Sequence, residues 1–392
     1  MRRILLAYEG FYKASGGVET HLRDITRKLP HDFDIVTDLF PSDLAYRNRE
    51  LGRARLIEIG PRNGSITTRP TLQTTRWGFP VQLLGDFRRL RRKARLAGEL
   101  RWDVYHFHGH NVGSAILRLS RFLSSTRAMP WWFLDSTPRA RRLLTVHGLT
   151  SQFPHAPWVE ELEAMMLSRF DDAVCVDKHL VSIVERIANE NSFELCATYI
   201  PNCVDTEVFR YCASRQHAGL SVGFAGRAEM SRGIEWLARL ARLLPRAIQL
   251  HLALAGNRTD LSRIPQPLLT RANTVRVNVP HSQMVDFYKE VDVVVNPVLV
   301  RGISRTTLES MAVGRLPIML SIGDRYPVIH GRTGFLVNTV EEALALLTQL
   351  SQNREPLYAI SRRAREIVEH EFDCRVVLPS LEKVYEEIAS RD

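Results

Sequence analysis

The feature that most constrains the fold is an alternation of short aliphatic runs with longer amphipathic segments, which continues along all 392 residues. Aliphatic runs bounded by turn residues predict strands, and apolar residues that recur every three or four positions predict helices. The predicted strands are residues 4–8, 34–37, 56–59, 104–108, 143–147, 173–176 and 197–200 in the first half, and residues 221–225, 249–255, 274–277, 291–296, 316–320 and 334–337 in the second. Strands that alternate with helices form parallel sheets joined by right-handed crossovers. The chain is therefore predicted to be an α/β protein.

The alternation occurs twice, and the chain is longer than one hydrophobic core usually allows, so we expect two Rossmann-like, doubly wound domains. The expected domains are residues 1–205 and residues 206–372, joined in the polar stretch after Pro201. A last helical segment, residues 373–392, is expected to pack back on the N-terminal domain. Open parallel sheets bind ligands beyond the carboxyl ends of their strands, so functional residues are expected directly after strands.

Charge and hydropathy narrow the class of protein. The chain carries 53 lysines and arginines against 43 acidic residues, a formal net charge of +10. Such a basic surface suits nucleic acid, an anionic membrane surface or a diphosphate substrate. No helix-turn-helix, zinc-finger or aromatic RNA-binding motif accompanies the charge, so a nucleic-acid partner is not expected. No apolar run approaches the ~20 residues of a transmembrane helix, and the apolar segment after Met1 is too short for a signal peptide.

The five cysteines are an odd number without a CxxC pair, so neither a disulfide framework nor a zinc site is predicted. Cysteines without bridges are typical of a reducing compartment, and we expect a cytoplasmic protein. His106, His108 and His110 alternate along one predicted strand and its end, so they can share one face. No carboxylate or cysteine stands in register with them, and no metal site is predicted.

Two glycines and one histidine follow strands in the first domain. Gly16 and Gly17 lie between the first strand and the next helix, where glycine lets a backbone approach a phosphate at a helix N-terminus. A tight turn without a ligand explains them equally well. His147 ends another strand, where an imidazole can face a ligand, although a structural histidine at a strand end is the commoner case.

Two arginines flank one strand-to-helix turn in the second domain. Arg227 follows a predicted strand, and Arg232 stands five residues later at the start of a helix. A guanidinium group binds phosphate oxygens with two parallel hydrogen bonds, so such a pair suits a diphosphate. In a chain this rich in arginine, two unremarkable surface residues are the alternative interpretation.

The most informative stretch follows the strand that ends at Asn296. A loop is predicted there, and a helix begins after it, so that backbone N–H groups and the helix dipole form an anion site. Glu309, one turn inside this helix, can accept hydrogen bonds from ribose hydroxyls; a solvated helix glutamate is the alternative. The loop and the helix start supply the further candidates Arg301, Gly302, Ile303, Ser304 and Arg305.

Taken together, the ordered motifs resemble the retaining glycosyltransferases of the GT-B fold, family four of that class (glycosyl transferases group 1), over nearly the whole chain. The matching segments are residues 15–19, 103–108, 145–148, 200–209, 226–227, 232–233, 308–314 and 331–337. The resemblance implies two Rossmann-like domains facing across a cleft. It also implies transfer of a sugar, with retention of configuration, from a nucleotide-diphosphate sugar to a glycan, a lipid-linked glycan or a small molecule. No cofactor and no metal are expected, and the process served would be polysaccharide or glycoconjugate biosynthesis.

The resemblance implies a role for each candidate residue. Arg227 and Arg232 would neutralise the diphosphate, Glu309 would hold the ribose, and His147 would contact the transferred sugar. The glycines would allow a close approach of substrate. The implied catalytic set is His147, Arg227, Arg232 and Glu309. The implied donor-binding set is Gly16, Gly17, Arg227, Arg232, Arg301, Gly302, Ile303, Ser304, Arg305 and Glu309.

Four positions depart from the family pattern and qualify this hypothesis. Arg301 occupies the position of a family glutamate, eight residues before Glu309. Ser304 and Arg305 replace a usual glycine and aliphatic residue, and Cys203 stands where glycine is usual. The substitution at Arg301 keeps two alternatives open, namely a non-catalytic homologue that binds nucleotide sugars and a sugar-nucleotide epimerase of the same fold.

Two segments raise the hypothesis of peripheral attachment to the inner face of a membrane. Residues 86–101 combine a cluster of six basic side chains, within residues 88–95, with an opposing apolar stripe, which suits either anionic lipid or packing on the sheet. Residues 129–142 place adjacent tryptophans near arginines, which suits a membrane interface, a glycan or a buried aromatic plug.

Overall fold

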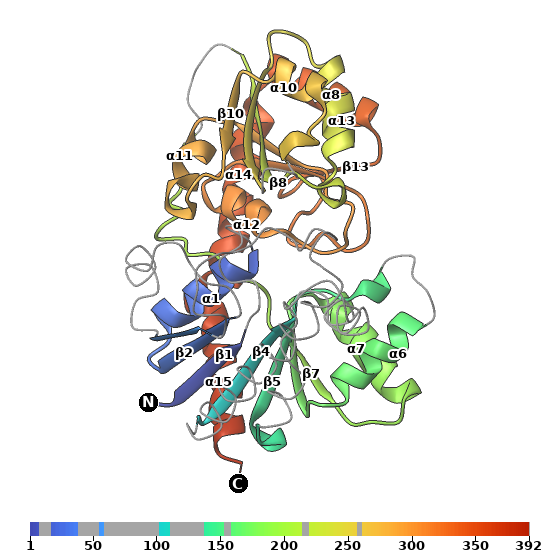
Figure 1. Cartoon of the computed structure of the whole chain (residues 1–392). Helices are drawn as coiled ribbons and strands as arrows, with labels where there is room; N and C mark the ends of the chain where they lie inside the picture. The colour runs from blue at the N-terminus through green and yellow to red at the C-terminus, as the bar shows by residue number, and fades with distance from the viewer. Residues whose placement is uncertain are drawn as a thin grey trace, which may run out of the picture. The chain divides into compact units, whose positions relative to one another are not determined.

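Two parallel β-sheets, each with helices beside it, make up the computed structural model of the chain (Figure 1). The structure describes residues 1–7, 17–37, 55–58, 102–109, 137–152, 158–213, 219–256 and 261–391. Two compact units account for the chain. The first consists of Met1–Lys13, Ile25–Ile200 and Ser380–Asp392, and the second of Ala14–Asp24 and Pro201–Pro379. The predicted boundaries at residues 205 and 372 stay predictions, and the longer segment of the second unit begins at Pro201.

The first unit is built on a seven-stranded parallel sheet with the order β3-β2-β1-β4-β5-β6-β7. Its strands are β1 (Arg3–Ala7), β2 (Asp32–Thr37), β3 (Arg55–Glu58), β4 (Val104–Gly109), β5 (Arg142–Val146), β6 (Asp172–Cys175) and β7 (Cys196–Tyr199). The described helices are α6 (Trp158–Leu167), α7 (Lys178–Glu190) and the short turns η1 (Arg139–Arg141) and η2 (Thr150–Gln152). Apolar residues of β1, β4, β5 and β6 pack against α6 and α7. Helices α1 (Gly17–Lys28) and α15 (Cys374–Ala389) each contribute residues to both units.

The second unit has a six-stranded parallel sheet with the order β10-β9-β8-β11-β12-β13. Its strands are β8 (Ser221–Arg227), β9 (Gln249–Ala255), β10 (Thr274–Val277), β11 (Val293–Asn296), β12 (Leu316–Leu320) and β13 (Phe335–Val337). Its helices are η3 (Met230–Arg232), α8 (Ile234–Leu243), α10 (Gln266–Arg271), η4 (His281–Gln283), α11 (Met284–Lys289), α12 (Arg305–Ala312), α13 (Val340–Gln352) and α14 (Glu355–Glu371).

The side chains of β11 show that helices cover both faces of this sheet. Val293 and Val295 pack with α8, α10 and α13, whereas Val294 packs with α11, α12 and α14. Successive side chains of a strand point to opposite faces, so a strand buried on both sides must be apolar at every position. The edge strand β10 alternates partly buried and exposed residues instead.

Each predicted strand overlaps an observed one, and the predicted fold class of two doubly wound parallel sheets is confirmed. In each sheet the order of strands reverses at one point, between β1 and β4 in the first unit and between β8 and β11 in the second. Loops that leave neighbouring strands in opposite directions open a crevice at such a point, and α/β proteins bind ligands there.

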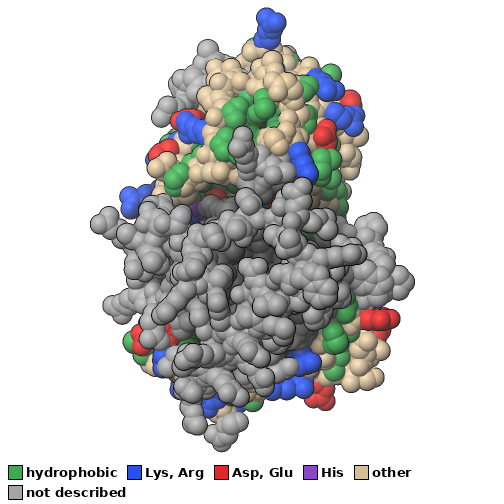
Figure 2. All heavy atoms as spheres, in the orientation of Figure 1, with side chains coloured by type: hydrophobic (Ala, Val, Ile, Leu, Met, Phe, Trp, Pro, Cys, Tyr) green, Lys and Arg blue, Asp and Glu red, His purple; other side chains and the backbone are tan. Residues whose placement is uncertain are grey.

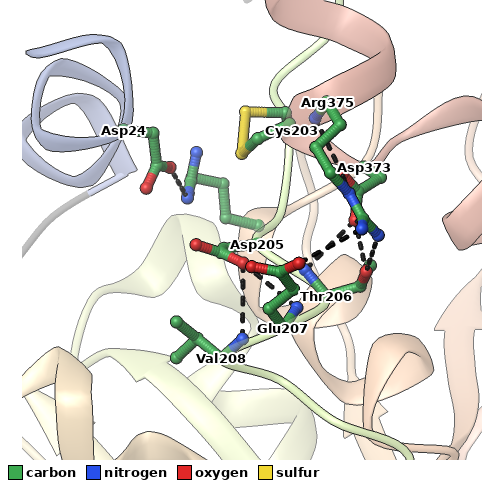
Figure 3. The surroundings of a disulfide bond; sticks show 10 residues. Asp24, Cys203, Asp205, Thr206, Glu207, Val208, Asp373 and Arg375 are labelled. Atoms are coloured by element: carbon green, nitrogen blue, oxygen red, sulfur yellow. Dashed lines mark hydrogen bonds and ion pairs between the residues drawn. A yellow bond between two sulfur atoms is a disulfide. The ribbon is translucent and has the colours of Figure 1, made fainter. Parts of the chain in front are cut away.

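One prediction about the cysteines is wrong, because Cys203 and Cys374 form a disulfide bond (Figure 3). The two residues lie 171 positions apart, and a parallel bridge between Val204 and Asp373 brings their Cα atoms to 4.9 Å. The spacing of the cysteines along the sequence does not indicate this tertiary contact, so the pair could not be predicted from it. Because disulfides are typical of oxidising compartments, the cysteines no longer support a cytoplasmic location, which stays a prediction.

Asp373, beside the disulfide, ties the segment after Pro201 to the start of α15. Its carboxylate accepts hydrogen bonds from the Thr206 hydroxyl and from Nε of Arg375, the latter at 2.9 Å (Figure 3). Although burial by itself raises the pKa of Asp373, the hydrogen bonds from Arg375 and Thr206 hold the pKa below its usual value. The carboxylate therefore stays ionised near neutral pH and keeps both partners.

Most of the two segments behind the membrane hypothesis lie outside the described residues. Among the described residues, no helix is both long and apolar enough to cross a bilayer. Residues 86–101 and the tryptophans of residues 129–136 lie outside the described part of the chain. Arg142 is buried in β5, where Nε donates to the Thr137 hydroxyl at 2.9 Å, so it is no surface group. On the face drawn in Figure 2, the basic side chains that can be seen are scattered among acidic and apolar ones.

We expect Cys203→Ser to lower the free energy of unfolding by about 2–5 kcal/mol, because the bridge closes a loop of 171 residues and restricts the unfolded chain. Urea denaturation without reductant measures the change, and Cys196→Ser, at a free and exposed cysteine, serves as the control. Thiol titration of the denatured, unreduced parent should find three thiols; finding five would show that the bridge does not form.

Candidate functional site

The carboxyl ends of β8 and β11, where the order of the second sheet reverses, are joined by a direct backbone contact. The turn after β8 ends at Gly233, whose φ is 74°, and a Cβ atom at this position would lie 2.0 Å from the carbonyl oxygen of Pro297. The N–H of Leu299 donates to the carbonyl of Ser231 at 3.0 Å. The turn that carries Arg232 therefore packs on the loop that follows β11, and only glycine fits at residue 233.

Two predicted phosphate-binding arginines lie at the two ends of this turn. Arg227 is the last residue of β8, and Arg232 ends η3; both are partly buried. Burial, together with the positive charge of Arg227, lowers the pKa of Arg232, and Glu229 opposes this effect. Glu229 lies 3.5 Å from Nη1 of Arg227 and is itself partly exposed. Two like charges held close together in a partly buried place favour the binding of an anion that relieves their repulsion.

A polar network fixes the start of α12 to the end of β11. Nδ2 of Asn296 lies 3.0 Å from the Ser304 hydroxyl and 2.8 Å from the Thr307 hydroxyl. Ser304 is the N-cap of α12, and its hydroxyl accepts a hydrogen bond from the N–H of Thr307. The predicted helix start at Arg305 is thus confirmed, and the Ser304 hydroxyl is already engaged in capping. Because the N–H groups of Thr307 and Leu308 already donate to Ser304, the N–H groups of Arg305 and Thr306 are the ones of the first turn that remain for an anion.

Arg325 is a buried residue that binds the backbone of the loop between β11 and α12. The sequence analysis did not predict this role. Its guanidinium is only 2% exposed and donates to the carbonyl oxygens of Val300 at 2.6 Å, Gly302 at 2.7 Å and Val298 at 2.7 Å. Nε donates to the carbonyl of Leu320 at 2.9 Å. Because alternate carbonyls of the loop point to one buried cation, the loop has a defined conformation. Nothing in the sequence separates this arginine from the many surface arginines.

The remaining loop candidates lie on different sides of the backbone. Arg301 is exposed, and its Cγ and Cδ atoms pass 3.1 and 3.2 Å from the position of a Cβ at Gly323. Gly302 has a φ of 87°, which glycine adopts without strain. Ile303 packs against the core beside α12. Arg301 is thus the loop residue that presents a charge to solvent.

Arg305, predicted to bind the donor, is a buried residue that reaches helix α1. Its Nη2 pairs with Oδ2 of Asp24 at 2.5 Å, and its Cδ lies 3.7 Å from the position of a Cβ at Gly17. Its Nε and Nη1 atoms are buried without an acceptor among the described residues. Arg305 therefore brings a partly satisfied positive charge next to Gly17; Gly16 lies outside the described residues.

Glu309 is enclosed rather than solvated, so the alternative of a solvated helix glutamate is wrong. It is 3% exposed; Oε1 lies 2.9 Å from Nε2 of His281, and Oε2 accepts from the Tyr288 hydroxyl at 3.0 Å. Burial by itself raises the pKa of Glu309, but the charge and hydrogen bond of His281, with the nearby Arg305, hold the pKa below its usual value. The side chain is therefore an ionised acceptor. Its part in ribose binding stays a prediction.

His147 belongs to the first unit, where it follows β5 directly. Its Nε2 atom is 3.2 Å from Nδ1 of His108 at the end of β4. His106 and His108 share one face of β4, with ring centroids 4.0 Å apart. Both ring nitrogens of His106 are occupied, by the Tyr385 hydroxyl at 2.7 Å and the Thr145 hydroxyl at 2.6 Å. The alternating-histidine metal site therefore loses His106, and His110 lies outside the described residues.

Known proteins share the fold of the chain, and one family model matches part of its sequence. Residues 219–353 match the family model of glycosyl transferases group 1. No curated relative matches the sequence. The chain is similar in structure to sucrose-phosphate synthase from Thermosynechococcus elongatus (TM-score 0.73, 16% identity, 99% of each chain covered). It is also similar to Anabaena HepE in complex with UDP-glucose (TM-score 0.71, 14% identity, 99% of this chain and 100% of the other) and to a glycosyltransferase from Rickettsia africae (TM-score 0.68, 16% identity, 100% and 99%). At these identities the structures show a shared fold.

We expect Arg325→Met to destabilise the protein by roughly 3–5 kcal/mol, because it removes a buried cation and leaves four buried carbonyls without donors. Urea denaturation provides the measurement. Arg301→Met, at an exposed position on the same loop, should change stability by no more than about 0.5 kcal/mol. Equal effects of the two substitutions would contradict the role of Arg325 in holding the loop.

Proposed function

Because residues 219–353 form a glycosyl transferases group 1 domain on a fold that glycosyltransferases share, we propose that the chain is an enzyme that transfers a sugar from a nucleotide-diphosphate sugar to an acceptor. The observation that carries this proposal is the placement of Arg227 at the end of β8 and of Arg232 in the turn that follows, at the point where the order of the second sheet reverses. Their mutual repulsion is relieved by a dianionic ligand such as a diphosphate.

The main contribution of the arginine pair to the proposed reaction is to stabilise the negative charge of the leaving diphosphate. A glycosyl bond to a diphosphate breaks as negative charge builds up on the leaving oxygens. Guanidinium groups held in place beforehand stabilise that charge without having to reorganise, and they act strongly where water is partly excluded. Arg227 and Arg232 are partly buried, and the contact between Gly233 and Pro297 fixes the turn between them. We therefore propose that the arginines take the role of charge sink and that no metal is required.

The start of α12 adds a second source of positive potential for the same anion. The N–H groups of its first turn and the helix dipole favour negative charge. Asn296 orients this turn, and Arg325 fixes the loop that leads into it. Gly302, Ile303 and Ser304 would then line the diphosphate with backbone groups. Arg305 would add a buried positive charge beside Gly17.

The residues proposed for the ribose, for the transferred sugar and for the acceptor are assigned by resemblance to the family. Glu309 is the proposed determinant of ribose recognition, and His147 is proposed to contact the transferred sugar, with retention of configuration. Gly16 and Gly17 are proposed to allow a close approach of substrate. Anabaena HepE was crystallised with UDP-glucose, and pneumococcal GtfA with UDP and GlcNAc, so UDP-sugars are the first donors to test. A carbohydrate or lipid-linked acceptor is proposed on the same basis.

A second candidate function rests on Arg301. An arginine at the position of the family glutamate favours a protein that binds a nucleotide sugar without transferring it. The intact arginine pair, the capped helix α12 and the buried Glu309 favour an enzyme instead. Incubating purified protein with UDP-glucose, UDP-GlcNAc or UDP-galactose and following release of UDP separates the two, since a binding protein releases none.

We expect Arg227→Ala and Arg232→Ala each to weaken UDP binding about 10- to 100-fold, because each loses a charge-assisted contact worth about 1.5–3 kcal/mol. Isothermal titration with UDP measures the loss, and uridine, which lacks the diphosphate, should bind the variants and the parent equally. Arg239→Ala removes an exposed arginine from α8 and serves as the matched control. Undiminished UDP affinity in both variants would remove the pair from the site.

We expect Arg301→Glu to lower kcat/KM roughly tenfold or more, because an exposed cation beside the diphosphate site is replaced by a repelling anion. The measurement uses the donor and acceptor found by screening. Arg301→Gln, which removes the charge without reversing it, should fall between the parent and the glutamate variant. A glutamate variant as fast as the parent would show that Arg301 does not face an acidic group of either substrate.

A further inference from the structure

Arg305 is a buried cation whose hydrogen-bonding capacity is only partly used. The residue is 7% exposed, and its Nη2 atom pairs with Oδ2 of Asp24 at 2.5 Å, the ion pair drawn from Asp24 in Figure 3. Nε and Nη1 are buried and have no acceptor among the residues that the structure describes. Buried donors are almost always bonded in folded proteins, because an unmade bond to a charged group is costly. These two donors therefore lack acceptor atoms that a ligand can supply.

The position of Arg305 in α12 adds positive charge to positive charge. Arg305 is the first residue of the helix, after the N-cap Ser304, and its own N–H group and that of Thr306 take no part in capping. The N-terminus of a helix carries partial positive charge, so an anion is favoured there and a cation is not. Asp24 supplies one carboxylate, which contacts Nη2 alone. A second anion beside the guanidinium would be stabilised by the remaining donors and by the helix dipole.

The N-terminus of α1 lies against the same guanidinium. The Cδ atom of Arg305 is 3.7 Å from the position of a Cβ at Gly17, the first residue of α1, and Gly17 is exposed. Gly17, Asp24 and Arg305 all belong to the second unit. The pKa of His21, one turn after Gly17, is lowered to about 3 by burial and by the charge of Arg305, so this imidazole is neutral near pH 7. A ligand group that enters beside Gly17 meets a cation and the starts of two helices.

This cation is distinct from the pair proposed to bind the diphosphate. Arg305 opens the helix after β11, whereas Arg227 and Arg232 flank the turn after β8. Burial lowers the pKa of Arg232, and the charges that add to or oppose this effect are those of Arg227 and Glu229. The charge of Arg305 acts instead on His21. The potential of Arg305 can favour the diphosphate from a distance, but its Nε and Nη1 donors need an acceptor in contact.

We propose that Arg305 forms a second anion-binding site, at the starts of α1 and α12, for a carboxylate or phosphate group of the transferred sugar or of the acceptor. Nε and Nη1 of Arg305, with the N–H group of Thr306, donate to the oxygens of this group, and Asp24 holds the guanidinium through Nη2. The inference rests on the proposed function, since it takes the leaving diphosphate to lie at Arg227 and Arg232. It restricts the substrates to a pair that carries an anionic group besides the diphosphate.

Inorganic phosphate is the probe, titrated into protein saturated with whichever of UDP, GDP and ADP the parent binds most tightly. Isothermal titration measures both affinities. We expect Arg305→Lys, which keeps the charge and can still pair with Asp24, to weaken phosphate binding about tenfold or more and nucleotide binding far less. Asp24→Asn with Arg305→Gln, which leaves no buried charge unpaired, should lose as much phosphate affinity. Arg239→Lys, at an exposed arginine beside Glu341, is the matched control, and unfolding midpoints show that each variant is folded.

The saturated protein separates a second site from the first. Failure of phosphate to bind once the nucleotide is in place would overturn the inference, because the anion of Arg305 would then be the diphosphate. Equal losses of phosphate and nucleotide affinity in Arg305→Lys, or undiminished phosphate affinity in both variants, would overturn it as well. If the parent binds none of the three nucleotides, the proposed function is wrong, and phosphate binding that depends on Arg305 would still establish the anion site.

Uronate and glucose forms of the preferred nucleotide, such as UDP-glucuronate and UDP-glucose, distinguish the two sources of the anion. They differ in a carboxylate on the sugar and share the diphosphate. Tighter binding of the uronate form, reduced about tenfold in Arg305→Lys, assigns the anionic group to the transferred sugar. Equal affinities for the two forms, together with phosphate binding that depends on Arg305, assign it to the acceptor.

Discussion

The second unit depends on positive charge buried against backbone carbonyls. Helix α12 lies in the core, so the carbonyls at its end cannot turn to water, and Arg365 donates to the carbonyl of Ala312 at 2.5 Å. Arg315, fully buried, donates to the carbonyls of Val291 and Val313. Arg325 does the same for the loop before α12. The planar fork of the guanidinium suits this task, because several donors leave one rigid group in fixed directions.

This arrangement has an electrostatic consequence for the site. Burial lowers the pKa of Arg315, which shows the cost of placing a cation in the core, and the carbonyl dipoles offset part of that cost. Loops held by such groups keep one conformation before a ligand arrives, so little free energy is lost in ordering them on binding. The buried cation of Arg325 and the partly buried pair of Arg227 and Arg232 add positive potential to the loops at this strand end, where Glu229 lies 3.5 Å from Arg227. An anionic ligand is therefore favoured over a neutral one of the same shape.

Much of this could be predicted from the sequence, because the signals involved are local. Strand periodicity fixed the two sheets, and the carboxyl ends of parallel strands meet at one edge, so Arg227 and Glu309 could be assigned to one unit. The bond between Cys203 and Cys374, the cation under the loop at Arg325 and the pairing of His281 with Glu309 could not. Each depends on segments far apart in the chain, and a buried arginine is indistinguishable in sequence from an exposed one.

The contact at Gly233 determines the distance between the turn that carries Arg232 and the loop that follows β11. Because Gly233 has no Cβ atom, its backbone contacts the backbone of Pro297 directly, and any side chain at residue 233 would hold the two backbones further apart. A Cβ placed 2.0 Å from the Pro297 oxygen would have to retreat by at least about 1 Å, and the adjoining Arg232 would move with it. Displacements of that size change catalytic rates by roughly 100-fold in well-oriented sites. Residue 233, which bears no functional group, thus determines the distance between the two loops that we propose bind the anion.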